Sequence, residues 1–267
     1  MIVSSVTRHG CLLLHVLSTR PSPLAVAEPP SSSTDGLPLL PNGERLSLGT
    51  LDFDDAGVGG RVWSSAPVLC EWLRKHFWPG DACLELGSGT GAVGLFAAGC
   101  GASRVVLSDG GPPALLALLA DNVRANGMSD VEVAELRWGA DAVLPDGPFQ
   151  WIIASDVTYD DDHHGPLADT LRALLVRAQR GGEPAPRVII AEEHGAPLES
   201  PDAAGRFLDE AFEAFRAAAA ERGLECRLPS EAGAGGADLS FSWPSEAFAE
   251  ARPFLMEVYL AASAEET

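Results

Sequence analysis

The stretch LELGSGTGAVGLF, residues 84–96, joins a short apolar run to a helical pattern through a glycine-rich loop. Glycine lets the backbone turn sharply from strand to helix and approach a ligand without a Cβ in the way. Two glycine patterns overlap here. Gly87, Gly89 and Gly91 form one, whereas Gly89, Gly91 and Gly94 fit the dinucleotide fingerprint G-x-G-x-x-G. The loop therefore predicts a nucleotide-binding turn without saying which nucleotide it binds.

From residue 81 onward, apolar runs alternate with amphipathic helical patterns. Strands are expected at residues 82–86, 104–108, 131–136, 151–155, 187–191, 224–228 and 254–261. Helices are expected at residues 90–98, from Pro112 to Gly127, after Pro166 to Gly181, and around Phe207–Phe215. Such alternation predicts a doubly wound, mostly parallel α/β sheet with helices on both faces. Ligands of these sheets bind at the carboxyl ends of the strands, where the strand order reverses.

Two carboxylates indicate what the loop binds. Asp109 ends the second expected strand, about 20 residues after the loop, where a carboxylate accepts hydrogen bonds from both ribose hydroxyls of an adenosine. Glu85 stands immediately before the glycines, and its negative charge would repel the phosphates of a dinucleotide. It suits a cationic ligand without phosphate, and S-adenosylmethionine carries a sulfonium and an ammonium. NAD is the alternative, although the chain has no Tyr-x-x-x-Lys pair for hydride transfer.

The segment SDVTYDDDHHGPL, residues 155–167, follows the fourth expected strand. Asp156 and Tyr159 emerge there at the ligand-binding edge, and we assign them to shaping and orienting a substrate site.

The residues after Tyr159 and after the fifth strand carry further charges. Asp160, Asp161 and Asp162, with His163 and His164, suit a solvated helix cap better than a metal site, because acidic residues favour a helix N-terminus. After the fifth expected strand come Glu192, Glu193 and His194. These three residues either meet a basic substrate or form an exposed loop.

Four segments, in this order, resemble the family-16 group of seven-strand methyltransferases, whose studied members are mostly protein-lysine N-methyltransferases. They are GGRVWSSAPVLCEWL (59–73), LELGSGTGAVGLFAAGCGASRVVLSD (84–109), LRWG (136–139) and SDVTYD (155–160). The resemblance spans about half the chain, from about Gly57 to Ala191. It implies a Rossmann-like class I methyltransferase sheet of seven strands with an antiparallel last strand, and S-adenosylmethionine as the cofactor.

The resemblance also implies roles for individual residues. Trp138 would lie beside the adenine, Asp109 would hold the ribose, and Ser155 would offer its backbone to the cofactor. The full set of expected cofactor-binding residues is Trp63, Glu85, Gly87, Ser88, Gly89, Asp109, Trp138 and Ser155. No metal is expected.

Composition bears on the partner. The chain has 38 acidic against 18 basic residues and a formal charge of −20. This balance argues against nucleic acid, whose binding relies on clustered Lys and Arg, and is compatible with a basic protein segment. No apolar run reaches the roughly 18 residues of a membrane-spanning helix, so no membrane is expected as a partner.

We therefore expect a monomeric methyltransferase acting on a lysine of a protein partner. A small-molecule methyltransferase remains an alternative, and the segment up to Trp63 and the Gly- and Ala-rich excursion at 229–250 would then cover its pocket. An inactive methyltransferase-like binding module is the third reading, and the intact glycines and Asp109 count against it.

The chain is expected to divide near residue 43. Residues 1–43 are interpreted as a disordered leader and linker, and residues 44–267 as the methyltransferase domain. The first 27 residues lack Asp and Glu and resemble an organelle transit peptide, whereas residues 28–43 are rich in Pro and Ser. Five scattered cysteines fit a reducing compartment. The expected location is the cytoplasm, or an organelle if the leader is a transit peptide.

Overall fold

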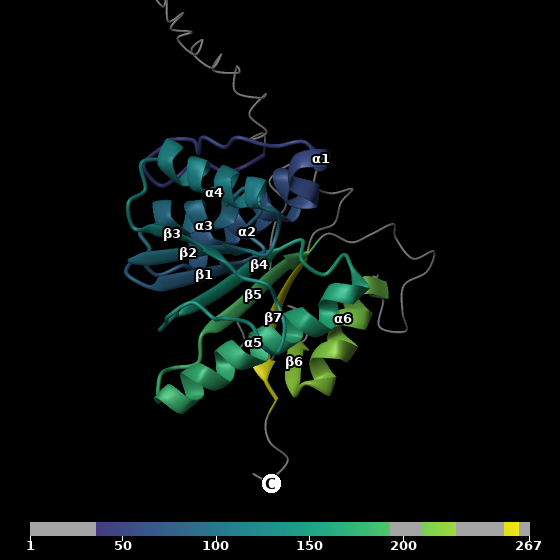
Figure 1. The fold of residues 1–267 in the computed structure, drawn as a ribbon. Coiled ribbons are helices and arrows are strands. Elements are labelled where there is room, and N and C mark those ends of the chain that lie inside the picture. Colours follow the sequence, from purple (N-terminus) through teal and green to yellow (C-terminus); the bar gives the residue numbers. More distant parts are fainter. Residues whose placement is uncertain (1–35, 193–209, 228–253, 262–267) are drawn as a thin grey trace, which may run out of the picture.

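Seven strands pair into one sheet in the order β3-β2-β1-β4-β5-β7-β6 (Figure 1). The computed structural model describes residues 36–192, 210–227 and 254–261. The strands are β1 (Ala82–Leu86), β2 (Arg104–Asp109), β3 (Val131–Glu135), β4 (Trp151–Ser155), β5 (Arg187–Glu192), β6 (Leu224–Arg227) and β7 (Phe254–Leu260). Strands β1 to β5 pair in parallel, and β7 pairs antiparallel with both β5 and β6. The predicted mostly parallel sheet with an antiparallel last strand is confirmed.

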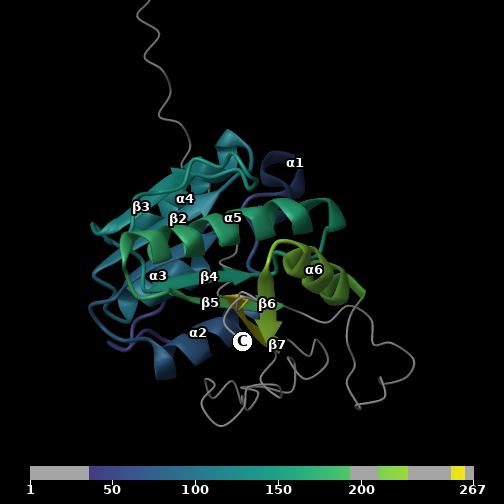
Figure 2. The same ribbon diagram turned by 90° about the horizontal axis from the view of Figure 1, so that it is seen from below.

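Helices cover both faces of the sheet (Figures 1 and 2). One face carries α2 (Ser65–His76), α3 (Ala92–Gly99) and α4 (Pro113–Ala125), and the other carries α5 (Asp161–Gly181) and α6 (Glu210–Glu221). A short lead, α1 (Phe53–Ala56) and η1 (Gly57–Gly60), precedes α2. Because both faces are covered, the central strands are apolar runs and not alternating patterns, as in WIIAS of β4.

Each face has its own apolar core. The residues of β1 alternate between them: Cys83 packs with α2 and α3, whereas Leu84 and Leu86 pack with α5 and α6. Trp72 and Phe96 are fully buried in the first core, and Phe215 in the second. These cores fix the relative positions of the strand ends, which is where the candidate site lies.

Residues on the N-terminal side of the expected boundary at residue 43 pack onto the domain. Leu37 and Leu40 are 6% and 7% exposed and join the core under α2 and α3. A turn closed by the hydrogen bond from Gly43 N–H to the Leu40 carbonyl directs the chain along the domain. The Pro- and Ser-rich composition of residues 28–43 predicts a linker, but Leu37 and Leu40 within it pack against an apolar surface of the domain. The leader up to residue 35 and the excursion at 229–250 lie outside the described residues.

Helix α5 begins five residues before the expected start at Pro166. Asp160 is its N-cap, and the side chain accepts a hydrogen bond from Asp162 N–H at 3.0 Å. Pro166 therefore lies inside the helix, where it forfeits a single backbone hydrogen bond. None of the helices in the described part of the chain has the length and apolarity needed to cross a membrane.

Candidate active site

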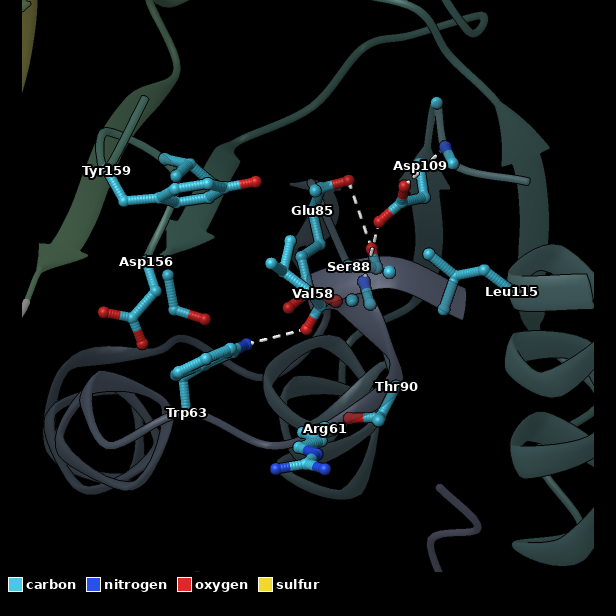
Figure 3. Close-up of a pocket in the computed structure, with 18 of the residues that line it drawn as sticks. Val58, Arg61, Trp63, Glu85, Ser88, Thr90, Asp109, Leu115, Asp156 and Tyr159 are labelled. Carbon is cyan, nitrogen blue, oxygen red and sulfur yellow. Dashed lines mark hydrogen bonds between the residues drawn. The ribbon is translucent and has the colours of Figure 1, made fainter. Parts of the chain in front are cut away.

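A cavity of about 1150 Å³ lies at the carboxyl ends of the strands, where the strand order reverses between β1 and β4. It is lined by all ten residues that the sequence singled out: Trp63, Glu85, Gly87, Ser88, Gly89, Asp109, Trp138, Ser155, Asp156 and Tyr159. In Figure 3, Tyr159, Asp156 and Trp63 lie on one side of this cavity, and Ser88 and Asp109 on the other. The predicted cofactor-binding residues and the predicted substrate-orienting residues, Asp156 and Tyr159, thus line the same cavity.

The turn after β1 depends on glycine at two positions of this wall. Gly87 and Gly89 have φ values of +65° and +52°, in the left-handed region that side chains disfavour. A Cβ on Gly87 would lie 2.9 Å from the Val157 side chain, and a Cβ on Gly89 would lie 2.8 Å from the carbonyl oxygen of Gly59. The loop is therefore packed between the β4 and η1 ends of the site, and both glycines are needed for it to fit.

Gly94, the last glycine of the dinucleotide pattern, has a different role. It lies in the first turn of α3, and its N–H donates to Glu85 Oε2 at 3.1 Å. Glu85 is 2% exposed, and burial raises its pKa to about 8. Its carboxyl group occupies the helix N-terminus, where a dinucleotide fold binds pyrophosphate. This arrangement favours a ligand without phosphate, and a bound cation would favour the ionised form of Glu85.

Asp109 is fixed by the backbone of the loops around it. Its Oδ2 accepts from Gly89 N–H and its Oδ1 from Gly111 N–H, both at 2.8 Å. A carboxylate oxygen has a further lone pair after one such bond, so each oxygen can still accept a hydrogen bond from a hydroxyl group of a ligand. The side chain is thereby oriented at the cavity wall before any ligand arrives.

The two tryptophans of the site differ in their surroundings. Trp63 is 47% exposed, and its Nε1–H donates to the Val58 carbonyl at 2.9 Å. Trp138 is half-buried beside Gly87, with the His163 ring edge-on at 6.0 Å. Within the described residues, Trp138 Nε1 is the buried side-chain nitrogen or oxygen that lacks a hydrogen-bond partner. An unmet buried donor costs about 1–3 kcal/mol, and other atoms of the same side chain line the cavity.

Asp156 joins the loop after β4 to the start of α2. Its φ is +52°, which is uncommon for a residue with a side chain. Oδ2 accepts from the Ser65 hydroxyl at 2.5 Å and from Ser65 N–H at 3.3 Å. Tyr159, three residues on, is 56% exposed, and its hydroxyl points into the cavity (Figure 3).

Glu192 corrects one interpretation of the sequence. It belongs to β5 and is 5% exposed, so the exposed-loop reading is wrong for this residue. It lines the cavity, and its Oε1 accepts from the N–H groups of Val157 at 2.9 Å and Thr158 at 3.1 Å. Burial, and then the charge of Asp156, raise the pKa of Glu192 to about 8. Glu193 and His194 lie outside the described residues.

The solvated-cap interpretation holds for the aspartates at the start of α5 but is wrong for His164. That ring is 3% exposed, and its Nε2 lies 2.7 Å from the Thr158 carbonyl oxygen. Its helical position turns it toward the α6 core, where it meets Phe215 edge-on at 5.8 Å. In the described part of the chain, no three His, Cys, Asp or Glu side chains converge as a metal site would.

Sequence reasoning missed several wall residues that come from the lead into α2. Val58, Gly59 and Arg61 line the cavity beside the glycine loop. A signal was available in the Gly59–Gly60 pair, since the Gly59 backbone packs against Gly89. Leu115 of α4 also lines the wall and gave no comparable signal, because its pattern is that of an ordinary core leucine.

The sheet order, the antiparallel β7 and the cavity behind a glycine loop define the class I methyltransferase fold. Among solved structures, the ribosomal protein L11 methylase from Lactobacillus delbrueckii subsp. bulgaricus matches with a TM-score of 0.51. The match covers 84% of this chain and 90% of that chain at 15% sequence identity, and it shows the fold alone.

The family follows from the sequence match. The family model described as lysine methyltransferase matches residues 45–191, and the chain belongs to this family. Protein N-lysine methyltransferase METTL21A of Danio rerio is 36% identical over 128 residues, covering 46% of this chain and 58% of that protein. EEF1A lysine methyltransferase 3 of Mus musculus is 32% identical over 157 residues, covering 53% and 66%. Histone-arginine methyltransferase METTL23 of Mus musculus is 34% identical over 122 residues, covering 44% and 48%. The chain spans about half to two thirds of the length of these relatives.

Proposed function

We propose that this protein transfers a methyl group from S-adenosylmethionine to a lysine side chain of a protein partner. The observation that carries the proposal is a single cavity with two differently built sides. The glycine loop and Asp109 form one side, and Asp156 and Tyr159 lie on the other (Figure 3). Glu192 accepts hydrogen bonds from the loop between Asp156 and Tyr159. Small-ligand sites occupy roughly 300–1,000 Å³. At about 1150 Å³, the cavity has room for a cofactor and an entering side chain together.

The residues of the cofactor side suit S-adenosylmethionine. When bound, it supplies an electrophilic methyl group on a sulfonium. Asp109 would accept the ribose hydroxyls, the unpaired Trp138 N–H would donate to an acceptor of the ligand, and Glu85 would favour its positive charge. This chain therefore contributes binding, alignment and exclusion of water, which are what a displacement at a pre-activated carbon requires.

The acceptor side suits a cationic side chain that must lose a proton before it attacks. Burial of an amine disfavours its charged form and so lowers its pKa. The Tyr159 hydroxyl and the backbone around Asp156 would orient the neutral amine. Two carboxyl groups, those of Asp156 and Glu192, line the cavity. Asp156 would attract the ammonium form as it enters, whereas Glu192, whose pKa burial raises to about 8, would add to this attraction only in its ionised form.

Two relatives named for lysine methylation support a lysine acceptor, and one relative named for histone-arginine methylation keeps arginine as the second candidate. Both acceptors are cationic, so the acidic chain and the carboxyl groups of the site suit either. The nature of the methylated residue in the product separates them.

The test is labelled-methyl transfer to a protein extract by the 267-residue chain. After incubation with methyl-labelled S-adenosylmethionine, the protein fraction is hydrolysed and its methylated amino acids are identified. We expect methyl-lysine, lost in Asp109→Ala and Tyr159→Phe and kept in Asp130→Ala, which changes an exposed residue. Detection of methyl-arginine instead would make arginine, and not lysine, the acceptor. Label confined to small molecules would exclude a protein partner, and cofactor binding without transfer would indicate a binding module.

A further inference from the structure

The loop between β4 and α5 is held from two sides at Thr158. The N–H of Thr158 donates to Glu192 Oε1 of β5, and its carbonyl oxygen lies 2.7 Å from His164 Nε2 of α5. Thr158, Glu192 and His164 are 3%, 5% and 3% exposed. The peptide groups before and after one buried residue are thus each bound by a buried side chain from another element.

The chemistry of both contacts is determined by the partners. A carbonyl oxygen only accepts, so His164 must carry its proton on Nε2 and donate it. Glu192 Oε1 accepts two backbone N–H groups at once, those of Val157 and Thr158. A buried backbone group without a partner costs free energy, so each contact holds the loop in this conformation and against others.

Tyr159 follows directly and is aimed by this backbone. Its ring is 56% exposed and touches His163 edge-on at 6.5 Å, so packing restrains it weakly. Its hydroxyl nevertheless points into the cavity (Figure 3). An exposed side chain keeps a direction only if its Cα is fixed, and the hydrogen bonds on either side of Thr158 fix it.

We infer that Glu192 and His164 are positioning residues of the acceptor site, which together hold Thr158 so that the Tyr159 hydroxyl faces the incoming side chain. The inference rests on the proposed function for its meaning, since Tyr159 is there the residue that orients the acceptor. The orientation of the Tyr159 side chain, which the inference predicts, can be measured without any methyl transfer.

The composition of the chain offers a direct readout, because it contains two tyrosines, Tyr159 and Tyr259. In a Tyr259→Phe background labelled with 3-fluorotyrosine, one ¹⁹F resonance reports on Tyr159. We expect Glu192→Ala and His164→Leu to move this resonance toward the position of a solvated tyrosine. Glu192→Gln and His164→Gln should leave it nearly in place, because the amide oxygen still accepts from the loop and the amide N–H still donates to Thr158.

Two further variants separate positioning from stability. Glu192→Asp keeps a carboxyl group but withdraws it from the loop by one methylene, so it should shift the resonance even where Glu192→Ala folds poorly. Glu257→Gln changes another buried carboxyl, bound to Arg187 at 3.1 Å, and should lower the unfolding temperature without moving the resonance. A resonance that stays in place in Glu192→Asp and His164→Leu while the unfolding temperature falls would overturn the inference.

Kinetics complete the test once an acceptor has been labelled. Loss of positioning should lower kcat at least tenfold in Glu192→Ala and leave the Kd of S-adenosylmethionine unchanged, with recovery in Glu192→Gln. Loss of kcat in Glu192→Gln as well would contradict a positioning role. A shifted resonance in a chain that transfers no methyl group would refute the proposed function and leave the positioning of Tyr159 intact.

Discussion

At the scale of single residues, Asp109 is the residue predicted to bind the ribose of the cofactor. It is already held by Gly89 and Gly111 at 2.8 Å, so it meets a ribose without reorganising. We predict that Asp109→Ala weakens the binding of S-adenosylmethionine by about 10–100-fold, the equivalent of the roughly 1.5–3 kcal/mol that hydrogen bonds to a charged group contribute. Calorimetric titration with S-adenosylmethionine, S-adenosylhomocysteine and NAD measures this, with Asp130→Ala as the control. Binding of NAD alone would contradict the reading of the glycine loop.

Glu85 makes stability depend on pH in a direction that can be worked out. Its pKa in the folded protein is about 8 against an ordinary value of 4.5, so the folded state binds more protons between these two values. The contribution of Glu85 to the free energy of unfolding therefore falls as pH rises from about 4.5 to 8 and is constant above. We predict that Glu85→Gln, which keeps an acceptor for Gly94, makes urea unfolding less dependent on pH across this window.

The comparison needs a matched control because 38 acidic side chains titrate in the same chain. Glu183→Gln removes an exposed carboxyl and should leave the slope of the wild-type protein unchanged. Equal slopes in Glu85→Gln and wild type would mean that the Glu85 carboxyl is not held in a buried, protonated form at neutral pH.

At the scale of elements, the strands were predictable and one helix start was not. All seven expected strands are present to within one residue, because each is an apolar or alternating run bounded by glycine, proline or charge. The apolar stripe predicts a helix after Pro166, whereas α5 begins at Asp161 with Asp160 as its N-cap. Local sequence does not say whether the helix begins after a cap at Asp160 or at the proline six residues later.

The roles of buried polar side chains were the part that sequence could not supply. Glu192 and His164 resemble exposed residues in the sequence, since charged side chains mostly lie at the surface. Their burial depends on the loop after β4 lying between β5 and α5, which is a tertiary arrangement. The residues of the glycine loop and Asp109 were predictable because their spacing along one βαβ unit carries the geometry with it.

One contact between elements lies on the face of the sheet that α2, α3 and α4 cover, and it contributes to the stability of the fold. Arg187 of β5 has its guanidinium carbon 5.4 Å from the Trp72 ring and 4.9 Å from the Trp151 ring, and it pairs with Glu257 of β7 at 3.1 Å. We predict that Arg187→Met lowers the free energy of unfolding by roughly 2–3 kcal/mol, because it removes two cation–π contacts and leaves Glu257 buried without its partner.

Urea unfolding checks this value, and the double variant Arg187→Met/Glu257→Leu is the control. Removing both charges avoids the unpaired carboxylate, so the double variant should recover part of the loss. Cofactor affinity should be unchanged in both, since neither residue lines the cavity. A double variant less stable than the single one would place the main contribution in Glu257 and not in the pair.

At the scale of the whole molecule, the charge of −20 acts on the encounter with a partner. A basic acceptor is drawn to an acidic chain over distances that salt screens, with a Debye length of about 10 Å at 0.1 M ionic strength. The cofactor, by contrast, would be bound inside the cavity by short contacts. The two ligands should therefore respond differently to salt.

We predict that methyl transfer to a protein extract at limiting acceptor concentration falls severalfold between roughly 50 and 300 mM KCl, while the Kd of S-adenosylmethionine changes by less than about twofold. Initial rates of label incorporation at saturating cofactor measure the first quantity, and calorimetry at the same salt concentrations measures the second. If transfer does not depend on salt, the partner is recognised by apolar contacts, for which Val58, Trp63 and Tyr159 are exposed around the cavity. If both quantities fall together, the salt acts on the cofactor site, and the charge of the chain has no part in choosing the acceptor.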